Sequence, residues 1–183
     1  DGDTSTSDTV LVFATGTVPL GFSPRSIRDE RLQPFRAALD KVMLDLAQQI
    51  VRDGEGATKL VRVDVSGATS IGAARRIGMA VANSPLVKTA VAGSDPNWGR
   101  IVMAVGKRGE NIFPEKLRIS IGPFLITERG RVREEFQESV VAAYMRGTEI
   151  EIGVDVGIGR GQSTVWTCDL SQEYVSINAD YRS

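Results

Sequence analysis

A turn from Ser94 to Arg100, with the sequence Ser-Asp-Pro-Asn-Trp-Gly-Arg, gathers a charge pair, a proline, an amide and an indole. Pro96 fixes its own φ angle and disfavours the helical conformation at Asp95. The apolar residues that follow, from 98 to 106, recur at helical spacing. The segment therefore predicts a rigid loop that leads into a buried helix.

The chemistry open to this turn is anion binding. Backbone N–H groups at the start of a helix attract anions, and Asn97 and Arg100 could add side-chain donors beside them. The alternative is a structural corner that an ion pair between Asp95 and Arg100 closes. The local sequence leaves both interpretations open.

Glu55 is a second candidate because it lies between Gly54 and Gly56, directly after a long predicted helix. The flanking glycines allow the backbone to place this carboxylate in one specific position. A carboxylate there could bind a cation, such as a substrate ammonium, through a charge-assisted hydrogen bond. The alternative is an exposed loop glutamate without a ligand.

The residues from 177 to 183 form a third candidate, because Ile177 and Tyr181 could anchor the terminus against the fold. An anchored terminus would let Asn178 present both groups of its amide, and Ser183 a hydroxyl and a carboxylate.

Two further patterns resemble ligand-binding motifs but lack the required residues. Residues 1–7 place oxygens at the odd positions of a calcium loop, yet Thr6 and Val12 replace its glycine and glutamate. The glycine-rich segment 157–161 lacks the spacing and the following helix of a nucleotide-binding loop, and a hairpin turn explains it. We therefore expect neither a metal nor a nucleotide cofactor.

The sequence contains no histidine, which removes much familiar catalytic chemistry. Ser-His-Asp and Cys-His nucleophiles, imidazole bases and histidine-containing zinc sites are all excluded for this chain. Catalysis therefore depends on carboxylates, hydroxyls, amines or a partner chain.

Composition predicts one compact domain over the 183 residues, with residues 110–116 as the place for a subdomain boundary. The 22 basic and 23 acidic residues give a net charge of −1, which argues against a nucleic-acid partner. The single cysteine, Cys168, cannot form an internal disulfide and favours a reducing, cytoplasmic location. No apolar run approaches the roughly 18 residues that a membrane span requires.

Helical and alternating patterns succeed one another along the chain. The apolar residues from 10 to 14 suggest a short buried helix, with a strand as the alternative. Helices are predicted at about 34–50, 71–82, 98–106 and 134–145, and strands at 59–65, 117–121, 149–156 and 163–170. The last two strands flank the glycine-rich segment and predict a C-terminal β-hairpin. The fold class is therefore α/β, with helices packed on a mixed, largely antiparallel sheet.

Five segments in the same order along the chain resemble the ornithine acetyltransferase family, the bifunctional glutamate N-acetyltransferases of arginine biosynthesis. The segments are 1–6, 54–59, 94–100, 165–170 and 177–183. The resemblance implies a precursor that cleaves itself into an α and a β chain, with a threonine at the new N-terminus as nucleophile. It also implies a heterotetramer of two α and two β chains.

The sequence departs from the family pattern at that nucleophile. The Ala-Thr-Met-Leu-like context of the family threonine is absent, and Asp1 corresponds to a point further along the β chain. Residues 1–183 therefore resemble the C-terminal part of the β chain, an incomplete piece of the self-cleaving, threonine-nucleophile fold. We expect no catalytic residue in this piece, and no activity from it alone.

The implied reaction is ping-pong acetyl transfer from N-acetylornithine to glutamate, with acetyl-CoA as a second donor in some members. The free α-amine of the threonine can act as its base, so no histidine is needed. By similarity, Glu55, Asn178 and Ser183 match the family's substrate-binding residues in this part of the chain, with Glu55 holding an ammonium.

Other functions remain open for the same residues. A paralogous acetyltransferase or a related self-cleaving aminopeptidase would share the segments, although the aminopeptidase should lack the Glu55, Asn178 and Ser183 set. A non-catalytic amino-acid-binding or assembly module is the alternative from a different class.

Overall fold

The computed structural model describes residues 2, 9–107 and 109–180, and these residues form two compact units. The larger unit runs from Ile50 onward and the smaller one ends at Gln49. Residues 110–116, where a boundary was predicted, lie inside the larger unit. The calcium-like segment at the N-terminus lies almost wholly outside the described residues, as does Ser183.

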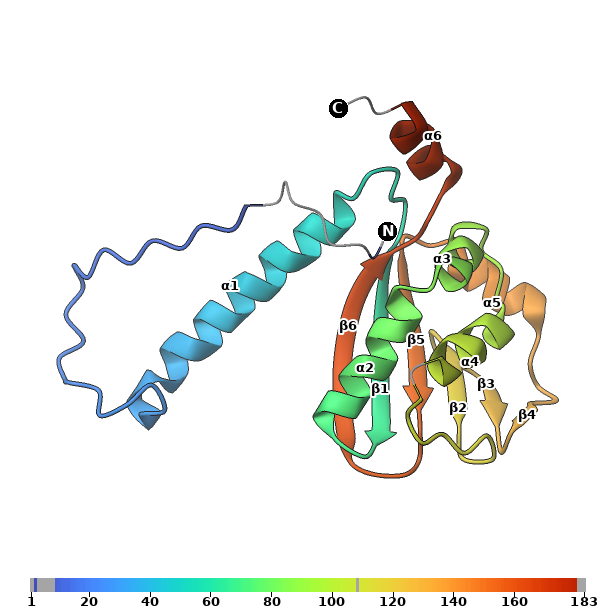
Figure 1. Cartoon of the computed structure of the whole chain (residues 1–183), viewed down its shortest axis with the longest axis horizontal. Coiled ribbons are helices and arrows are strands. Elements are labelled where there is room, and N and C mark those ends of the chain that lie inside the picture. The colour runs from blue at the N-terminus through green and yellow to red at the C-terminus, as the bar shows by residue number, and fades with distance from the viewer. Residues whose placement is uncertain (1, 3–8, 108, 181–183) are drawn as a thin grey trace. The chain divides into compact units, whose positions relative to one another are not determined.

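The larger unit is built on one six-stranded sheet (Figure 1), which confirms the predicted mixed, largely antiparallel α/β class. In the order β4-β3-β2-β5-β1-β6, only β1 and β5 run parallel. The strands are β1 (Leu60–Ala68), β2 (Arg118–Ile121), β3 (Phe124–Glu128), β4 (Arg131–Val132), β5 (Glu149–Asp155) and β6 (Gly161–Cys168).

Strict alternation in these strands gives the sheet one apolar face. In β1, Val61, Val63 and Val65 are buried, whereas Arg62 between them is exposed. Ile150, Ile152 and Val154 repeat the pattern in β5, as expected for residues that share one side of a strand. The apolar side chains of neighbouring strands therefore form a continuous core beneath the helices.

Helices α2 (Ile71–Ala82), α3 (Pro85–Ala92) and α4 (Trp98–Gly106) lie together on one side of this sheet (Figure 1). Ser70, Ser84 and Asn97 cap them, each accepting a hydrogen bond from a backbone N–H in the first turn. The bounds of α2 and α4 agree with the prediction. The α3 helix was not predicted.

The remaining helices of this unit are α5 (Glu138–Met145) and α6 (Gln172–Asp180). The α5 helix begins four residues later than predicted. Its Tyr144 ring lies against Gly122 and edge-on to Phe124, and its hydroxyl accepts a hydrogen bond from Glu151 N (3.1 Å).

The predicted C-terminal hairpin is wrong, because β1 lies between β5 and β6. The loop that connects them crosses the end of β1, where the N–H groups of Ile158 and Gly159 both donate to the Gly67 carbonyl. A Cβ atom at Gly159 would collide with the Ala68 carbonyl oxygen. The glycines therefore allow the loop between β5 and β6 to pass close to β1. A glycine-rich loop of this kind has the same sequence pattern as a tight hairpin turn.

The smaller unit contains the short 3-10 helix η1 (Glu30–Leu32) and most of α1 (Gln33–Arg52), which confirms the long amphipathic helix. Asp29 caps η1 and pairs with Arg31, and Arg36 donates to the Ile27 carbonyl. The apolar residues 10–14 form neither the predicted helix nor the alternative strand, and their large side chains are exposed. The prediction of burial fails because the smaller unit provides no layer to cover them.

Candidate functional site

The loop before β1 is held by a buried carboxylate at the end of β6. Asp169 is only 3% exposed, and its Oδ1 accepts hydrogen bonds from the backbone N–H groups of Thr58 (2.8 Å) and Lys59 (3.0 Å). Its Oδ2 accepts a third bond from the Thr58 hydroxyl (2.6 Å). These bonds fix the loop that carries Glu55 to a core strand.

Lys59 joins the ends of two helices to this loop. Its ammonium donates to the carbonyl oxygens of Val91 (2.8 Å), at the end of α3, and Met145 (2.7 Å), at the end of α5. It also donates to Ser94 Oγ (2.7 Å). Carbonyls at the C-terminal ends of helices attract cations, whereas burial lowers the pKa of this lysine despite the nearby Asp169.

Lys88 is buried more deeply, at 2% exposure, in α3. Its ammonium donates to Thr167 Oγ1 (2.8 Å) and to the Cys168 carbonyl. Burial lowers its pKa, and contacts with Cys168 and Asp169 oppose that change. Together, Asp169, Lys59 and Lys88 form what we call the polar hub, which ties α3, α5 and β6 to the start of β1.

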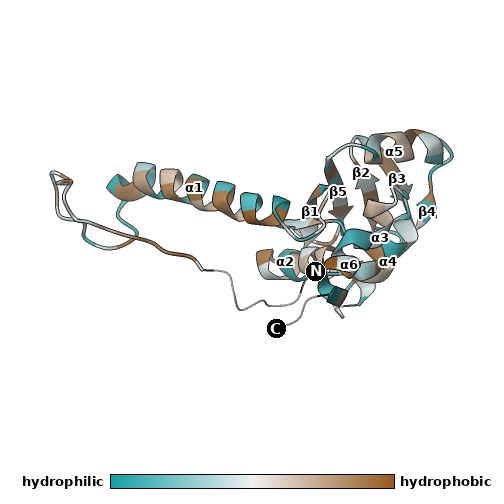
Figure 2. Ribbon diagram, turned by 90° about the horizontal axis from the view of Figure 1, so that it is seen from above, coloured by the Kyte–Doolittle hydropathy of each residue, from teal (hydrophilic) through white to brown (hydrophobic). Residues whose placement is uncertain are grey.

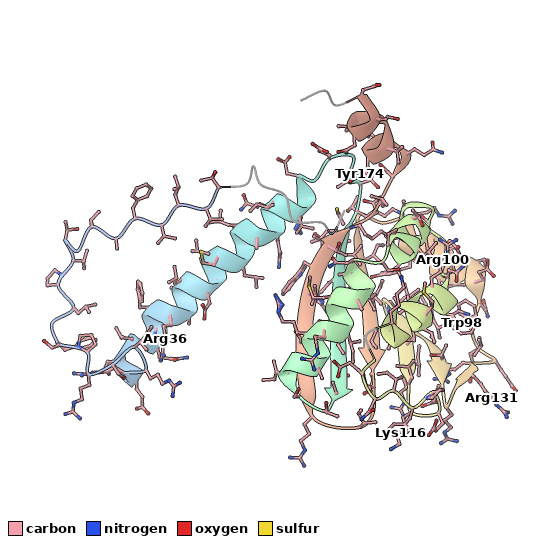
Figure 3. The ribbon with its side chains drawn as sticks, in the orientation of Figure 1. Arg36, Trp98, Arg100, Lys116, Arg131 and Tyr174 are labelled. Carbon is pink, nitrogen blue, oxygen red and sulfur yellow. The ribbon has the colours of Figure 1, made fainter. Side chains whose placement is uncertain are left out.

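Helix α6 packs directly on the loop beside the hub. Ser171 Oγ donates to the Gly56 carbonyl (2.6 Å), and a Cβ atom at Gly56 would collide with the backbone nitrogen of Tyr174. Gly56 also has a φ of +65°, which glycine adopts without strain. Figure 3 shows Tyr174 at this end of α6.

This packing brings Glu55 and Asn178 into contact, although 123 positions separate them in the sequence. Asn178 Nδ2 donates to Glu55 Oε2 (2.9 Å) and to the Tyr174 carbonyl (2.9 Å). Within the part of the chain that the structure describes, Glu55 Oε1 and Asn178 Oδ1 have no hydrogen-bond partner. Both side chains are exposed, so the pair presents two acceptor oxygens to solvent. Two such acceptors suit a donor-only cation such as an ammonium.

The polar side chains of the turn at residues 94–100 form hydrogen bonds within the fold. Asn97 Oδ1 accepts from Arg100 N as the cap of α4, and its Nδ2 donates to Asp95 (3.2 Å). The Arg100 guanidinium donates to the Leu86 carbonyl (2.9 Å) and to Thr89 Oγ1 (3.2 Å) rather than to Asp95. The proposed ion pair is therefore wrong, because α3 passes close enough to supply oxygens to Arg100. The Asn97 amide and Arg100 Nη1, two of the donors suggested for an anion, are therefore bonded within the fold.

Other features of the described residues do not compete with this site. An open groove of about 430 Å³ between β3 and α5 is lined by residues 123–125, 133, 135–137 and 140–141, none of which is a predicted site residue. No group of three or more metal-ligating side chains occurs among residues 2, 9–107 and 109–180. Over the same residues, no helix is long and apolar enough to cross a membrane.

The hub was not predicted from sequence. Lys59 and Asp169 lie within segments of the family pattern, but they were not singled out as residues. Lys88 carried one usable signal, an isolated lysine within the apolar run Leu-Val-Lys-Thr-Ala-Val-Ala.

Comparisons with known proteins agree over the whole chain. The ArgJ family model matches residues 1–183. The arginine biosynthesis bifunctional protein ArgJ of Brucella suis biovar 1 is 54% identical over 185 residues, and that of Ruegeria pomeroyi is 55% identical over 183 residues. Each match covers all of this chain but only 45% and 43% of the relative, so the chain spans less than half the length of these proteins.

The fold also has a solved counterpart. The crystal structure of arginine biosynthesis bifunctional protein ArgJ from Bacillus halodurans superposes with a TM-score of 0.90 at 40% sequence identity. The match covers 99% of this chain and 84% of that one. With the family model matching from end to end, the chain belongs to the ArgJ family.

Proposed function

We propose that this chain forms part of a bifunctional glutamate N-acetyltransferase that transfers the acetyl group of N-acetylornithine to glutamate. The observation that carries the proposal is the contact of Glu55 with Asn178, which unites two predicted substrate-binding residues from opposite ends of the larger unit. Ser183 is the third residue of the proposed site. In family terms the chain is the C-terminal part of the β chain.

The two acceptor oxygens of this pair fit the acetyl donor. N-acetylornithine carries a free side-chain ammonium, which is separate from the acetylated nitrogen that reacts. Glu55 Oε1 and Asn178 Oδ1 would each accept a hydrogen bond from that ammonium, while the bond between the two side chains keeps the acceptors at a fixed spacing. Charge-assisted hydrogen bonds of this kind contribute about 1.5–3 kcal/mol each.

The chemical step takes place on a threonine that we assign to the rest of the protein. Its hydroxyl attacks the acetyl carbonyl and gives its proton to the α-amine, and ornithine leaves as the amine after taking up that proton. The uncharged amine of glutamate then attacks the acetyl ester and loses a proton to the α-amine, which passes it to the departing threonine oxygen and so restores the hydroxyl. The complete absence of histidine from this chain is compatible with such a base.

The relative lengths support an enzyme of more than one piece. This chain covers 84% of the solved chain but 45% of the Brucella suis relative, so the solved chain is itself much shorter than the curated relatives. We propose an α chain as partner, in a heterotetramer of two α and two β chains located in the cytoplasm. Acetyl-CoA is the second acetyl donor to be tested, and no other cofactor is required.

Kinetics of Glu55→Gln in the complete enzyme test the proposal. We expect kcat/KM for N-acetylornithine to fall by about 1.5–3 kcal/mol, roughly 10- to 150-fold, because an uncharged amide holds an ammonium less strongly. Asp53→Asn removes the same charge from an exposed position two residues away and should leave the kinetics unchanged. An unchanged kcat/KM for Glu55→Gln would show that Glu55 does not bind the substrate.

A further inference from the structure

The hydroxyl group of Ser171 forms hydrogen bonds with both segments that carry the Glu55–Asn178 pair. Its Oγ donates to the Gly56 carbonyl oxygen (2.6 Å) and accepts from the backbone N–H of Tyr174 (3.4 Å). A serine hydroxyl has one donor hydrogen as well as accepting lone pairs, so both bonds can form together. Tyr174 is the third residue of α6, which places Ser171 at the N-cap of that helix. Ser171 therefore joins the start of α6 to the loop before β1.

These bonds are part of a closed ring that includes the Glu55–Asn178 pair. Gly56 directly follows Glu55 in the loop. On the other side of the ring, Asn178 Nδ2 donates to the Tyr174 carbonyl (2.9 Å) and to Glu55 Oε2 (2.9 Å). An amide nitrogen has two hydrogens, so these two bonds fix the direction of Asn178 Oδ1. The spacing of the two acceptor oxygens thus depends on how α6 is oriented on the loop.

The orientation of α6 is sensitive to the bond at Ser171. Asn178 lies seven residues after Ser171, which corresponds to about 10 Å along the helix axis. A tilt of about 10° at Ser171 would therefore move Asn178 by roughly 2 Å, which is enough to break its hydrogen bond with Glu55. The close contact of Gly56 with the backbone of α6 sets a minimum separation. The Ser171 hydrogen bond is directional, so it also restricts the tilt.

Apolar packing contributes little to holding α6 at one tilt. No residue of α6 is buried among the residues that the structure describes. Figure 2 shows hydrophobic residues at intervals along α1, where Leu39 and Val42 share one side of the helix. The aliphatic residues of α6, Val175 and Ile177, are two positions apart and so lie about 200° from each other around the axis. We therefore expect directional polar contacts, such as the Ser171 bond, to determine the orientation of α6.

We infer that Ser171 is a positioning residue for the substrate ammonium, which holds α6 at the tilt where Glu55 Oε1 and Asn178 Oδ1 accept hydrogen bonds from the same cation. Ser171 acts through Asn178 rather than by contact with the ammonium. The inference rests on the proposed function, because it requires that Glu55 and Asn178 bind the acetyl donor.

Steady-state kinetics of Ser171 variants in the complete enzyme test this role. Ser171→Ala removes both bonds, so KM for N-acetylornithine should rise about tenfold while kcat stays within about twofold, because the reacting threonine is unchanged. Ser171→Thr keeps the hydroxyl and should return KM to within about threefold of the wild type. Ser176→Ala is the matched control, because the Ser176 hydroxyl lies in the same helix and donates to the Gln172 carbonyl (3.2 Å). The control should have the KM of the wild type.

Ser171→Gly separates positioning from helix capping. Glycine is nearly as good an N-cap as serine but has no hydroxyl to donate to Gly56. We expect KM to rise as it does for Ser171→Ala. A wild-type KM for Ser171→Gly would leave Ser171 with a capping role alone and would overturn the inference.

The background of Asn178→Ala shows whether Ser171 acts through Asn178. In that background, Ser171→Ala should raise KM by less than about twofold, because the side chain that it positions is already absent. The same tenfold rise in both backgrounds would contradict the inference.

Glu55→Gln distinguishes failure of this inference from failure of the proposed function. If Glu55→Gln impairs the use of N-acetylornithine while Ser171→Ala and Ser171→Gly keep the wild-type KM, only the role of Ser171 is wrong. If Glu55→Gln is as active as the wild type, the proposed substrate site is wrong, and the role of Ser171 with it.

Discussion

The polar hub and the Glu55–Asn178 pair both include a residue of the loop before β1, Lys59 in the hub and Glu55 in the pair. They use the same kinds of polar groups but differ in how many of those groups lack a hydrogen-bond partner. Asp169 accepts three hydrogen bonds while almost fully buried, and Lys59 donates three. Glu55 and Asn178 share one bond and keep two oxygens turned to solvent. Buried polar groups with every partner supplied stabilise a fold, whereas exposed acceptors held at a fixed spacing can bind a ligand. The hub should therefore control stability and the pair should control function.

Asp169→Ala is expected to produce the largest change in stability. It removes the acceptor of three hydrogen bonds and a buried negative charge near two lysines, so the free energy of unfolding should fall by about 3–5 kcal/mol. Urea unfolding measures the loss, with Asp53→Ala as an exposed control that should change it by less than about 0.5 kcal/mol. A loss below about 1 kcal/mol for Asp169→Ala would mean that the hub does not support the fold.

Gly56→Ala should damage both regions, because Gly56 connects them. The left-handed φ of +65° costs an alanine about 1–3 kcal/mol, and its methyl group would push α6 away from the loop. Since α6 carries Asn178, we also expect kcat/KM for N-acetylornithine to fall. Gly99→Ala is the control, because Gly99 lies inside α4 without a backbone clash. A Gly56→Ala enzyme with normal stability and kinetics would show that α6 does not depend on this contact.

Lys88→Met should lower the free energy of unfolding by about 1–3 kcal/mol at neutral pH, since two partly buried oxygens lose their donor. The loss should also depend on pH. Burial lowers the pKa of Lys88 in the folded protein, below its ordinary value of 10.5. At pH values between the folded-state pKa of Lys88 and 10.5, the unfolded chain binds more protons than the folded protein. The free energy of unfolding therefore rises with pH across that window and is independent of the Lys88 titration below it.

The methionine variant lacks this alkaline rise, so the wild type should gain stability relative to Lys88→Met as pH approaches 10.5. Urea unfolding of both proteins from neutral pH upward provides the comparison. Parallel stability curves would indicate that Lys88 titrates as it does in the unfolded chain.

Asn178→Ala should have the smallest effect on stability and still reduce activity. Asn178 is exposed in α6, so the free energy of unfolding should change by less than about 0.5 kcal/mol. Loss of its oxygen and of its bond to Glu55 should lower kcat/KM for N-acetylornithine by about tenfold. Ser176→Ala, in the same helix, is the control. A large loss of stability would place Asn178 with the hub instead.

Local sequence signals predicted the elements whose ends are set by nearby residues. The observed bounds of α2 agree with the prediction because Ser70 caps its start and Ser84-Pro85 follows its end. The hairpin prediction failed because the decision between a tight turn and a crossing over β1 depends on a strand almost a hundred residues earlier. The prediction that residues 10–14 are buried failed for a related reason, because the run itself does not show whether other residues pack over it.

In the candidate site too, the individual residues were predicted from local signals, whereas their contact was not. The flanking glycines marked Glu55 as a residue in a defined position, and Asn178 was predicted from its place in the terminal segment. Their direct contact depends on the antiparallel pairing of β1 with β6, which brings the loop before β1 next to the segment after β6. Long-range pairing of this kind has no local signal, and neither does the burial of Lys88.

A double-mutant cycle on Glu55 and Asn178 in the complete enzyme tests the central claim most directly. The cycle compares kcat/KM for N-acetylornithine in the wild type, Glu55→Gln, Asn178→Ala and the double variant. If the two side chains bind one ammonium as a unit, kcat/KM of the double variant should be little lower than that of the more impaired single variant. The coupling energy should then be at least about 1 kcal/mol. Additive losses, or no loss in either single variant, would contradict the account.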